Sequence, residues 1–247
     1  MERLISELKK KIIEMKRVTN DSIDLSDERL KELYSVYPFN KFEFVISHLI
    51  ATKTISLSEY LDLRQSYISR NKYLHLFELA PRTFGETWGQ QYLIEHIPEL
   101  QIPTKYNDSN YIGQYDLIYK NIHIEVKASR AVQKISGGTL SDKALLYAQK
   151  DKAKYLMNFQ QLKPSCCDVF VWIAVWKDNI TFWVIPSNDV KNYAHFSSQH
   201  RKENKISSTG EIYEGQIMVK PNNIKDFDRY LVSSQEILKA IEERGRF

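Results

Sequence analysis

The stretch of residues 113–130, GQYDLIYKNIHIEVKASR, contains the feature that most constrains the fold of this chain. Two runs, Gln114–Tyr119 and Ile122–Lys127, are rich in β-branched and aromatic residues, and only the dipeptide Lys120-Asn121 separates them. Runs of this composition with a two-residue gap predict a β-hairpin closed by a tight turn. The turn fixes a register in which one face is wholly apolar, with the pairs Tyr119–Ile122, Leu117–Ile124 and Tyr115–Val126.

The other face of this hairpin carries the polar side chains. Asp116 lies opposite Glu125, and Lys127 shares the face of Glu125 because side chains alternate along a strand. Directly opposed residues have Cβ atoms roughly 4.5–5.5 Å apart, and two carboxylates that close repel each other unless a cation lies between them. We therefore expect a metal site here; the alternative is an amphipathic hairpin edge with a solvated charge cluster.

Basic residues are concentrated around this hairpin. The segment 120–163 has eight Lys and one Arg against three acidic residues, a net charge of +6, whereas the whole chain has a formal net charge of +4. A local excess of this kind is typical of a surface that binds nucleic acid.

The spacing of Asp116, Glu125 and Lys127 resembles the D-xn-E-x-K signature of the PD-(D/E)xK nuclease superfamily, which includes most type II restriction endonucleases. Tyr115 stands where the family name has proline. The resemblance covers roughly residues 83–186. It implies an α/β (α+β) fold in which an αβββαβ core has a mixed sheet flanked by helices.

The resemblance also implies the roles of the site residues. Asp116, Glu125 and the backbone carbonyl of Val126 would bind Mg²⁺, for which Mn²⁺ would substitute, and Lys127 would orient or deprotonate the attacking water. Many members carry a further acid on the helix before the hairpin, a position that Glu86 fits. Thr83 with Glu86 three residues later is also a capping box, so Glu86 has two interpretations.

As a whole, the resemblance implies a Mg²⁺-dependent type II restriction endonuclease that hydrolyses double-stranded DNA at a specific sequence. It would act as a homodimer, with a cognate DNA methyltransferase as a genetic partner. Two alternatives stay open: a structure-specific repair or recombination nuclease such as a resolvase, and a DNA-binding protein without catalysis. The residues expected to contact DNA are polar or basic and lie near the motif or in the C-terminal tail: Gln114, Ser129, Arg130, Gln133, Lys134, Lys143, Lys150, Arg201 and Lys202.

Beyond the hairpin, periodicity and breakers predict further elements. A helix is expected from Ser141 or Asp142 to about Leu162. Strands are expected at Asp168–Trp176, Ile180–Ile185 and Glu211–Val219. A last helix is expected at Ser233–Glu243. Residues 81–247 would form the nuclease domain with a C-terminal DNA-contacting extension.

Residues 1–80 are expected to form a helical subdomain. Helical spacing begins at Leu4, and helices are expected at Asp27–Tyr37, Phe42–Ala51 and Glu59–Tyr67, the last with Ser58 as its N-cap. A helix-turn-helix DNA reader with Ser66–Leu74 as its second helix is an alternative interpretation of residues 41–77.

The composition indicates a soluble, cytoplasmic protein. The only cysteines, Cys166 and Cys167, are adjacent and give no disulfide framework. The N-terminus lacks a secretory apolar region. The longest apolar run, Val169–Trp176, is far shorter than the roughly 18 residues of a membrane helix.

Overall fold

A computed structural model describes residues 10, 13, 39–198, 206–207, 210–211 and 214–245. The chain forms two compact units, Met1–Ser66 and Tyr67–Phe247. The helices expected before Pro38 lie outside the described residues.

The described part of the first unit is helical. It contains the 3₁₀ helix η1 (Phe39–Phe42), α3 (Glu43–Ala51) and the start of α4 (Leu57–Arg70). The N-cap of α4 is Ser56 rather than Ser58, because the Ser56 hydroxyl accepts the Glu59 N–H while the Glu59 carboxylate accepts the Ser56 N–H. Since α4 continues through Ser66, the helix-turn-helix interpretation, which needs a new helix there, is wrong.

The second unit is built from two sheets and a set of helices. Its strands are β1 (Leu117–Tyr119), β2 (Ile122–Arg130), β3 (Val132–Gln133), β4 (Tyr155–Leu162), β5 (Val169–Val175), β6 (Ile180–Pro186), β7 (Ser197–Ser198), β8 (Ile206–Ser207), β9 (Gly210–Glu211), β10 (Gly215–Val219) and β11 (Leu231–Val232). Its helices include η2 (Leu74–Phe77), the π-helical turn η3 (Thr83–Trp88), α5 (Gly89–His96), η4 (Tyr147–Gln149), α6 (Ser187–Lys191), η5 (Ile224–Tyr230), η6 (Ser234–Glu236) and α7 (Ile237–Arg244).

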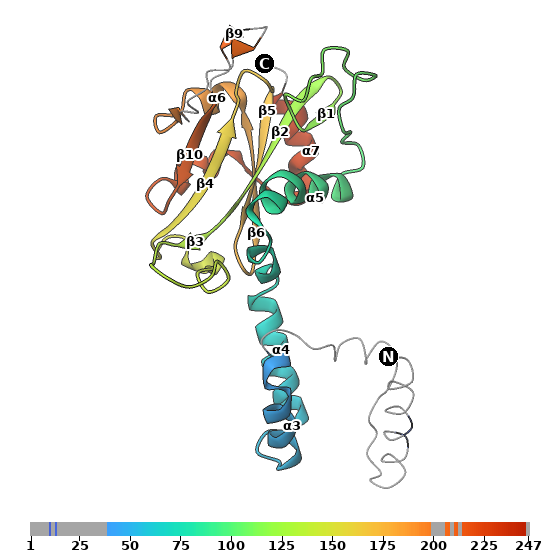
Figure 1. Ribbon diagram of the computed structural model, residues 1–247, viewed down its shortest axis with the longest axis vertical. Coiled ribbons are helices and arrows are strands. Elements are labelled where there is room, and N and C mark those ends of the chain that lie inside the picture. Colours follow the sequence, from blue (N-terminus) through green and yellow to red (C-terminus); the bar gives the residue numbers. More distant parts are fainter. Residues whose placement is uncertain are drawn as a thin grey trace. The chain divides into compact units, whose positions relative to one another are not determined.

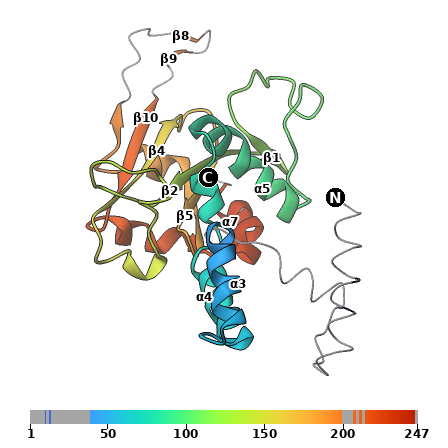
Figure 2. The same cartoon turned by 60° about the horizontal axis from the view of Figure 1, so that its bottom comes forward.

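The larger sheet is mixed, which confirms the expected α/β class. Its strand order is β1-β2-β5-β6-β11, with β2 and β5 parallel and the other pairs antiparallel. A second sheet has the order β3-β4-β10-β7. Figure 1 shows β4 and β10 on one side of the larger sheet and α5 and α7 on the other, and Figure 2 shows the same order from a second direction.

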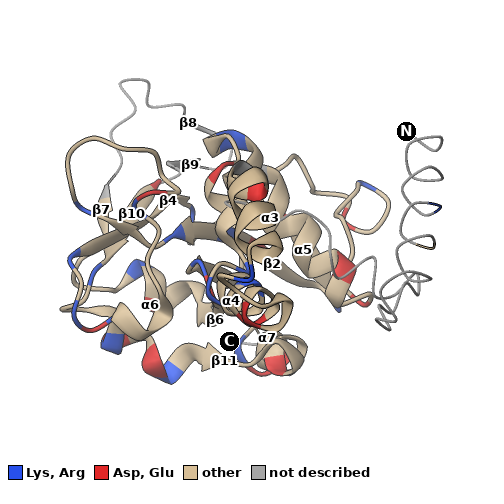
Figure 3. Cartoon of the chain, turned by 90° about the horizontal axis from the view of Figure 1, so that it is seen from below, with Lys and Arg blue, Asp and Glu red and all other residues tan. Residues whose placement is uncertain are grey.

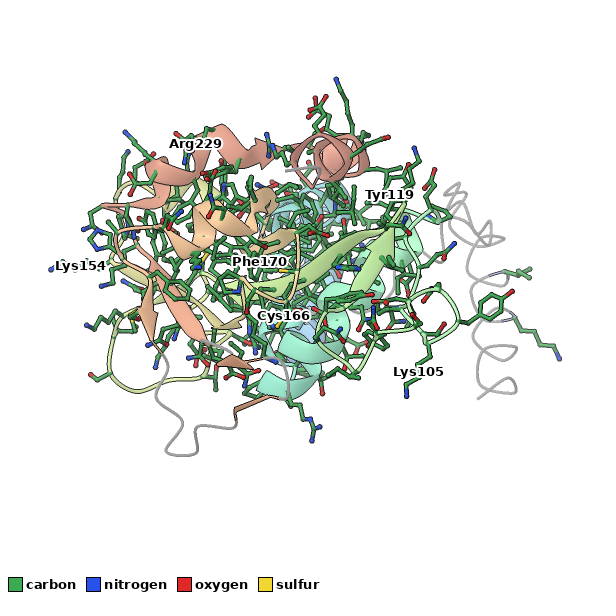
Figure 4. All side chains as sticks on the ribbon, turned by 90° about the horizontal axis from the view of Figure 1, so that it is seen from above. Lys105, Tyr119, Lys154, Cys166, Phe170 and Arg229 are labelled. Atoms are coloured by element: carbon green, nitrogen blue, oxygen red, sulfur yellow. The ribbon has the colours of Figure 1, made fainter. Side chains whose placement is uncertain are left out.

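The central strand β5 explains why this part of the sequence is so continuously apolar. All seven of its residues are buried. Val171 and Ile173 pack in the cluster that contains residues of α5 and α7, whereas Phe170 and Trp172 pack in the cluster that contains residues of β4 and β10. Phe170 accordingly lies in the middle of the unit in Figure 4, with Lys154 and Arg229 at its periphery. A strand covered on both faces needs apolar side chains at every position.

The hairpin forms with the expected turn and register. Leu117 pairs with Ile124 and Tyr119 with Ile122, and both turn residues, Lys120 and Asn121, have positive φ angles of 45° and 64°. Positive φ at both positions is the type I′ geometry that matches strand twist. The two-residue turn is therefore confirmed.

The first strand of the hairpin is shorter than expected. It begins at Leu117 rather than Gln114, so the pair of Tyr115 with Val126 does not form. Tyr115 instead packs in the cluster on the other side of the sheet, where its ring stacks on His123 and its hydroxyl donates to Asp108 at 2.5 Å. These contacts draw the chain out of the ladder just before Asp116.

The helix expected at residues 142–162 is wrong. This segment contains only the short η4 and then strand β4. Tyr155, Met157 and Phe159 are buried in the core while the residues between them are not, and this period of two places them on one face of a strand. The expected helix therefore has the wrong period for the second half of this segment.

The helix before the hairpin begins earlier than expected. Residues 81 and 82 are already helical, and Arg82, directly before η3, has helical φ and ψ angles of −66° and −49°. Thr83 therefore lies inside the helix and is not its N-cap, which makes the capping-box interpretation of Thr83 wrong. Pro81 suits the first helical position because it lacks an N–H that would need a partner.

The C-terminal elements follow the expected pattern. The strand expected at 211–219 is present as β9 and β10, separated by residues that include undescribed ones. The last helix is present as η6 and α7, and Ser233 and Glu236 form a reciprocal capping box at its start. Among the described residues, no helix combines the length and apolar character that crossing a membrane requires.

Candidate active site

The carboxylate of Asp116 is directed at the neighbouring strand. Its Oδ2 atom accepts the backbone N–H of Val126 at 2.8 Å, and its own backbone carbonyl accepts the side-chain amide of Gln90, from α5, at 3.0 Å. The N–H and C=O of one strand residue point to the same side of the strand. The carbonyl of Val126 therefore faces the edge of β2 at which Asp116 lies.

The helix that supplies Gln90 lies very close to β2. A Cβ atom added at Gly89 would be 3.3 Å from the Cβ of Ala128 and 3.4 Å from a methyl of Val126. Only glycine allows this approach without displacing the neighbours. The close packing holds Gln90, and through it the backbone of Asp116, against the strand that carries the other polar residues.

Glu125 and Lys127 share one face of β2, as their spacing predicts. The Nζ atom of Lys127 is 2.6 Å from Oε1 of Glu125, and the Glu125 side chain is 6 % exposed. A charge-assisted hydrogen bond of this length is strong when water is excluded. It fixes the ammonium group beside the carboxylate.

Burial dominates the ionisation of both acids. Desolvation raises the pKa of Glu125 to about 7, against the opposing effect of Lys127 and with the help of Asp116. Desolvation also raises the pKa of Asp116, and it outweighs the effects of Lys127 and of the Val126 N–H. Because burial disfavours the charged form of both acids, a bound cation would favour their ionisation.

These three residues line one cavity of about 590 Å³. Its wall is formed by the start of the helix before the hairpin, by β2 and by β4, with contributions from Gln90, Gln114 and Ser129. The structure thus brings Asp116, Glu125 and Lys127 together with three of the residues expected to contact DNA, Gln114, Ser129 and Arg130.

The third side of the cavity comes from residues that sequence reasoning missed. Asn158, Gln160, Gln161 and Lys163, on β4 or directly after it, all line the cavity. Lys163 is 3.7 Å from Glu214 and helps to lower the pKa of both Asp116 and Glu125, against their burial. The alternation of Met157 and Phe159 with Asn158 and Gln160 was the available signal, and it is short enough to fit a helix as well.

Arg130 also borders the cavity, but its guanidinium has partners within the protein. Its Nη1 atom donates to the carbonyls of Leu76, Phe77 and Leu79 at 3.0–3.1 Å, and the group lies 4.2 Å from the ring centre of Phe84. Desolvation lowers the pKa of this guanidinium. These contacts satisfy carbonyls at the end of η2 that would otherwise lack donors.

The remaining expected DNA contacts lie away from the cavity or outside the described part. Gln133, Lys134, Lys143 and Lys150 do not line it. Lys134 borders a separate pocket of about 390 Å³ together with Lys154 and Lys220, and Lys150 lies over the ring of Tyr147 and 3.7 Å from Asp151. Arg201 and Lys202 lie outside the described residues. For Glu86 the structure describes the backbone, in η3, and not the side chain.

Charge over the second unit is mixed. Figure 3 shows both basic and acidic residues on this part of the chain. Positive charge in the cavity is therefore local and comes from residues such as Lys127 and Lys163. Comparisons of the chain with protein-family models, with curated proteins and with solved structures gave no match.

Proposed function

We propose that this chain is a Mg²⁺-dependent endonuclease that hydrolyses double-stranded DNA at a specific sequence. The observation that carries the proposal is the meeting of Asp116, Glu125 and Lys127 in one cavity. One acid lies directly before β1, and the other lies on β2 two residues before the lysine. Metal-assisted hydrolysis of a phosphodiester can use such a set of groups. The resemblance to the PD-(D/E)xK superfamily adds DNA as the substrate.

The acids suit a magnesium ion. Among the described residues, no group of three or more His, Cys, Asp or Glu side chains gathers as a metal site. Mg²⁺, however, usually keeps several waters and needs only one or two carboxylates. Asp116, Glu125 and the Val126 carbonyl would hold it, and Mn²⁺ would substitute. When bound, the ion would supply charge neutralisation at the phosphate and a more acidic water.

The other catalytic roles would belong to residues of the chain itself. The Val126 N–H holds the carboxylate of Asp116 and the Gln90 amide holds its backbone carbonyl, which would limit the movement of this residue on binding. The Lys127 ammonium is positioned to orient the attacking water or to take part in its proton transfer, and it offsets negative charge on the phosphate. Glu86 is proposed as a further acid of the site on resemblance alone.

The sheet would be a variant of the αβββαβ core. In support of this, the hairpin strand β2 runs parallel to the later strand β5, as a crossover connection requires. The connection here contains β3, η4 and β4 in place of the expected helix. A homodimer and a cognate DNA methyltransferase belong to the same proposal.

The test is digestion of a sequenced plasmid with the full-length protein, with Mg²⁺ and with EDTA. Discrete fragments that require Mg²⁺ are the expected result. Asp116→Asn, Glu125→Gln and Lys127→Met should abolish cutting and retain the ability to shift DNA in a gel. Matched controls on exposed positions are Asp228→Asn, Glu243→Gln and Lys239→Met, which should cut as the wild type does.

Three outcomes would overturn this proposal in different ways. A fully active Asp116→Asn protein would show that Asp116 is not part of the active site. Cutting of branched DNA alone would indicate a structure-specific nuclease. Intact plasmid with a retained gel shift would indicate a DNA-binding protein without catalysis.

A further inference from the structure

Strand β4 contains an irregularity beside the candidate active site. Its pairing with β10 joins Phe159 to Ile217 and Leu162 to Gly215, so the two residues Gln160 and Gln161 oppose the single residue Gln216. Gln161 has a φ angle of 54°. Two residues facing one on the partner strand form a β-bulge, a device that re-aims side chains and is frequent next to active sites.

The bulge changes which side chains face the core. Met157 and Phe159 are buried, and an uninterrupted strand would bury residue 161 next. The extra residue moves this position to Leu162, which is fully buried. Gln160 and Gln161 both line the cavity instead. Without the bulge, an amide would enter the apolar core and the cavity would lose one of its polar groups.

These amides face the strand that carries the candidate catalytic residues. Strand β4 contacts β2, although the two strands belong to different sheets. Lys127 and Lys163 border the same cavity and are suited to phosphate oxygens. The parts of the DNA beyond the phosphate would therefore be contacted by Gln160 and Gln161.

The chemistry of a carboxamide favours one class of ligand. A phosphate offers only acceptors, so the oxygen of a glutamine amide would gain nothing from it. The edge of a base offers a donor beside an acceptor, and adenine presents N6–H and N7 in the spacing that a glutamine amide matches. Neighbouring Asn158 has an Oδ1 atom that is shielded from solvent and has no hydrogen-bond partner, while its Nδ2 donates to Gln216. Asn158, Gln160 and Gln161 together give this side of the cavity three carboxamide side chains.

We propose that Gln160 and Gln161 are specificity-determining residues that contact base edges, preferentially adenine, next to the phosphodiester bound at Asp116 and Glu125. The inference rests on the proposed nuclease function and names the residues that select its sequence. Non-glycine residues in a left-handed conformation occur where the surrounding structure requires them. Here the positive φ of Gln161 belongs to the bulge that turns the amides of Gln160 and Gln161 towards the cavity.

The test is digestion of a DNA library randomised in sequence, with Mg²⁺, followed by sequencing of the cut ends. We expect the wild type to prefer adenine at one or more positions near the cut. Gln160→Ala should reduce that preference by about 10-fold or more, the discrimination expected of one bidentate contact. Gln161→Gly keeps the positive φ and removes the amide, so it should have a similar effect while the bulge persists.

Two further variants separate recognition from folding. Gln161→Asn keeps an amide in a residue that tolerates a positive φ, and it should retain more adenine preference than Gln161→Gly at an equal melting temperature. Gln91→Ala, on the exposed side of α5, should leave the preference unchanged.

Each contrary result has a distinct meaning. Equal loss of cutting on all sequences, or an unchanged preference in both glutamine variants, would overturn the inference and leave the nuclease function intact. Cutting by the wild type without any base preference would overturn both this inference and the sequence specificity of the proposed function, and would leave only Mg²⁺-dependent hydrolysis of DNA. Failure of the wild type to cut any DNA would overturn the proposed function and this inference with it.

Discussion

The ammonium nitrogen of Lys127 lies 2.6 Å from a carboxylate oxygen of Glu125, two residues earlier on the same strand. Despite this cation, the pKa of Glu125 is raised to about 7, because burial has the larger effect. Ionising Glu125 and Asp116 in this buried site therefore has a free-energy cost that Lys127 does not fully offset. This imbalance is the physical reason for expecting a divalent ion, and it leads to measurable consequences.

The first prediction concerns the lysine. Lys127→Met should lower the rate of DNA cleavage by about 100-fold or more, the typical contribution of a group that assists proton transfer. The loss should fall on kcat rather than KM, because the ammonium acts on the reacting water and phosphate. Single-turnover cleavage of a plasmid measures it, with Lys239→Met as the exposed control. A wild-type rate in Lys127→Met would contradict the assigned role.

The second prediction concerns stability against pH in EDTA. In its folded state Glu125 keeps its proton up to a pH of about 7, whereas its ordinary pKa is 4.5. Between these values the folded state binds more protons than the unfolded one, so the free energy of unfolding should fall as the pH rises. The raised pKa of Asp116 acts in the same direction. Urea unfolding across pH 4.5 to 7.5 checks this.

A matched pair of variants isolates the contribution of Glu125 to that pH dependence. Glu125→Gln cannot ionise, so its stability should decline less over this pH range than that of the wild type. Glu243→Gln, at an exposed position, should follow the wild-type curve. If the free energy of unfolding changed with pH in the same way in Glu125→Gln and in the wild type, Glu125 would not be the source of the pH dependence.

The third prediction concerns metal binding without catalysis. An ion that binds only the folded state stabilises it by about 2.7 kcal/mol at a concentration 100 times its Kd. Mg²⁺ should therefore raise the melting temperature of the wild type, and the shift should be larger at pH 8 than at pH 5.5 because protons compete for the acids. Asp116→Asn should lose most of the shift, whereas Asp228→Asn should keep it. An equal Mg²⁺-induced shift of the melting temperature in both variants would show that the ion does not bind at Asp116.

The fourth prediction concerns Arg130. Arg130→Met would leave three carbonyls, those of Leu76, Phe77 and Leu79, without their present donor. We expect the free energy of unfolding to fall by about 3 kcal/mol, within the range for buried groups that lose their partners. Arg70→Met, on the exposed surface of α4, should change it little. Weakened DNA binding at unchanged stability would instead support the DNA contact expected from the sequence.

The hairpin and the two central strands could be predicted because local patterns decide them. A two-residue turn sets the register of Leu117 with Ile124 by geometry alone. A strand buried on both faces, such as β5, has an unmistakable composition. The proximity of Asp116, Glu125 and Lys127 follows from that register, so this part of the candidate site was accessible from sequence.

The fourth strand could not be predicted so easily. Its sequence, YLMNFQQL, alternates apolar and polar residues only from Met157 to Gln160, because Leu156 lies before this run and the bulge at Gln160-Gln161 ends it. Helical and strand periods fit such a short, interrupted run about equally well. The loss of this strand from the prediction removed Asn158, Gln160, Gln161 and Lys163 from the expected site. The role of Arg130 as a donor to distant carbonyls depends on tertiary contacts that no local pattern reveals.

Strand β2 is hydrogen-bonded along both edges, to β1 on one side and to β5 on the other. Inserting or deleting one residue within it would exchange the two faces for the residues on one side of the change, which would turn the Glu125 side chain into the apolar layer or the Val126 side chain out of it. We infer that length changes in this region are tolerated only in pairs or in the turn. Any homologue that conserves the chemistry should therefore keep the same number of residues between the two acids and the lysine, or compensate at Lys120-Asn121.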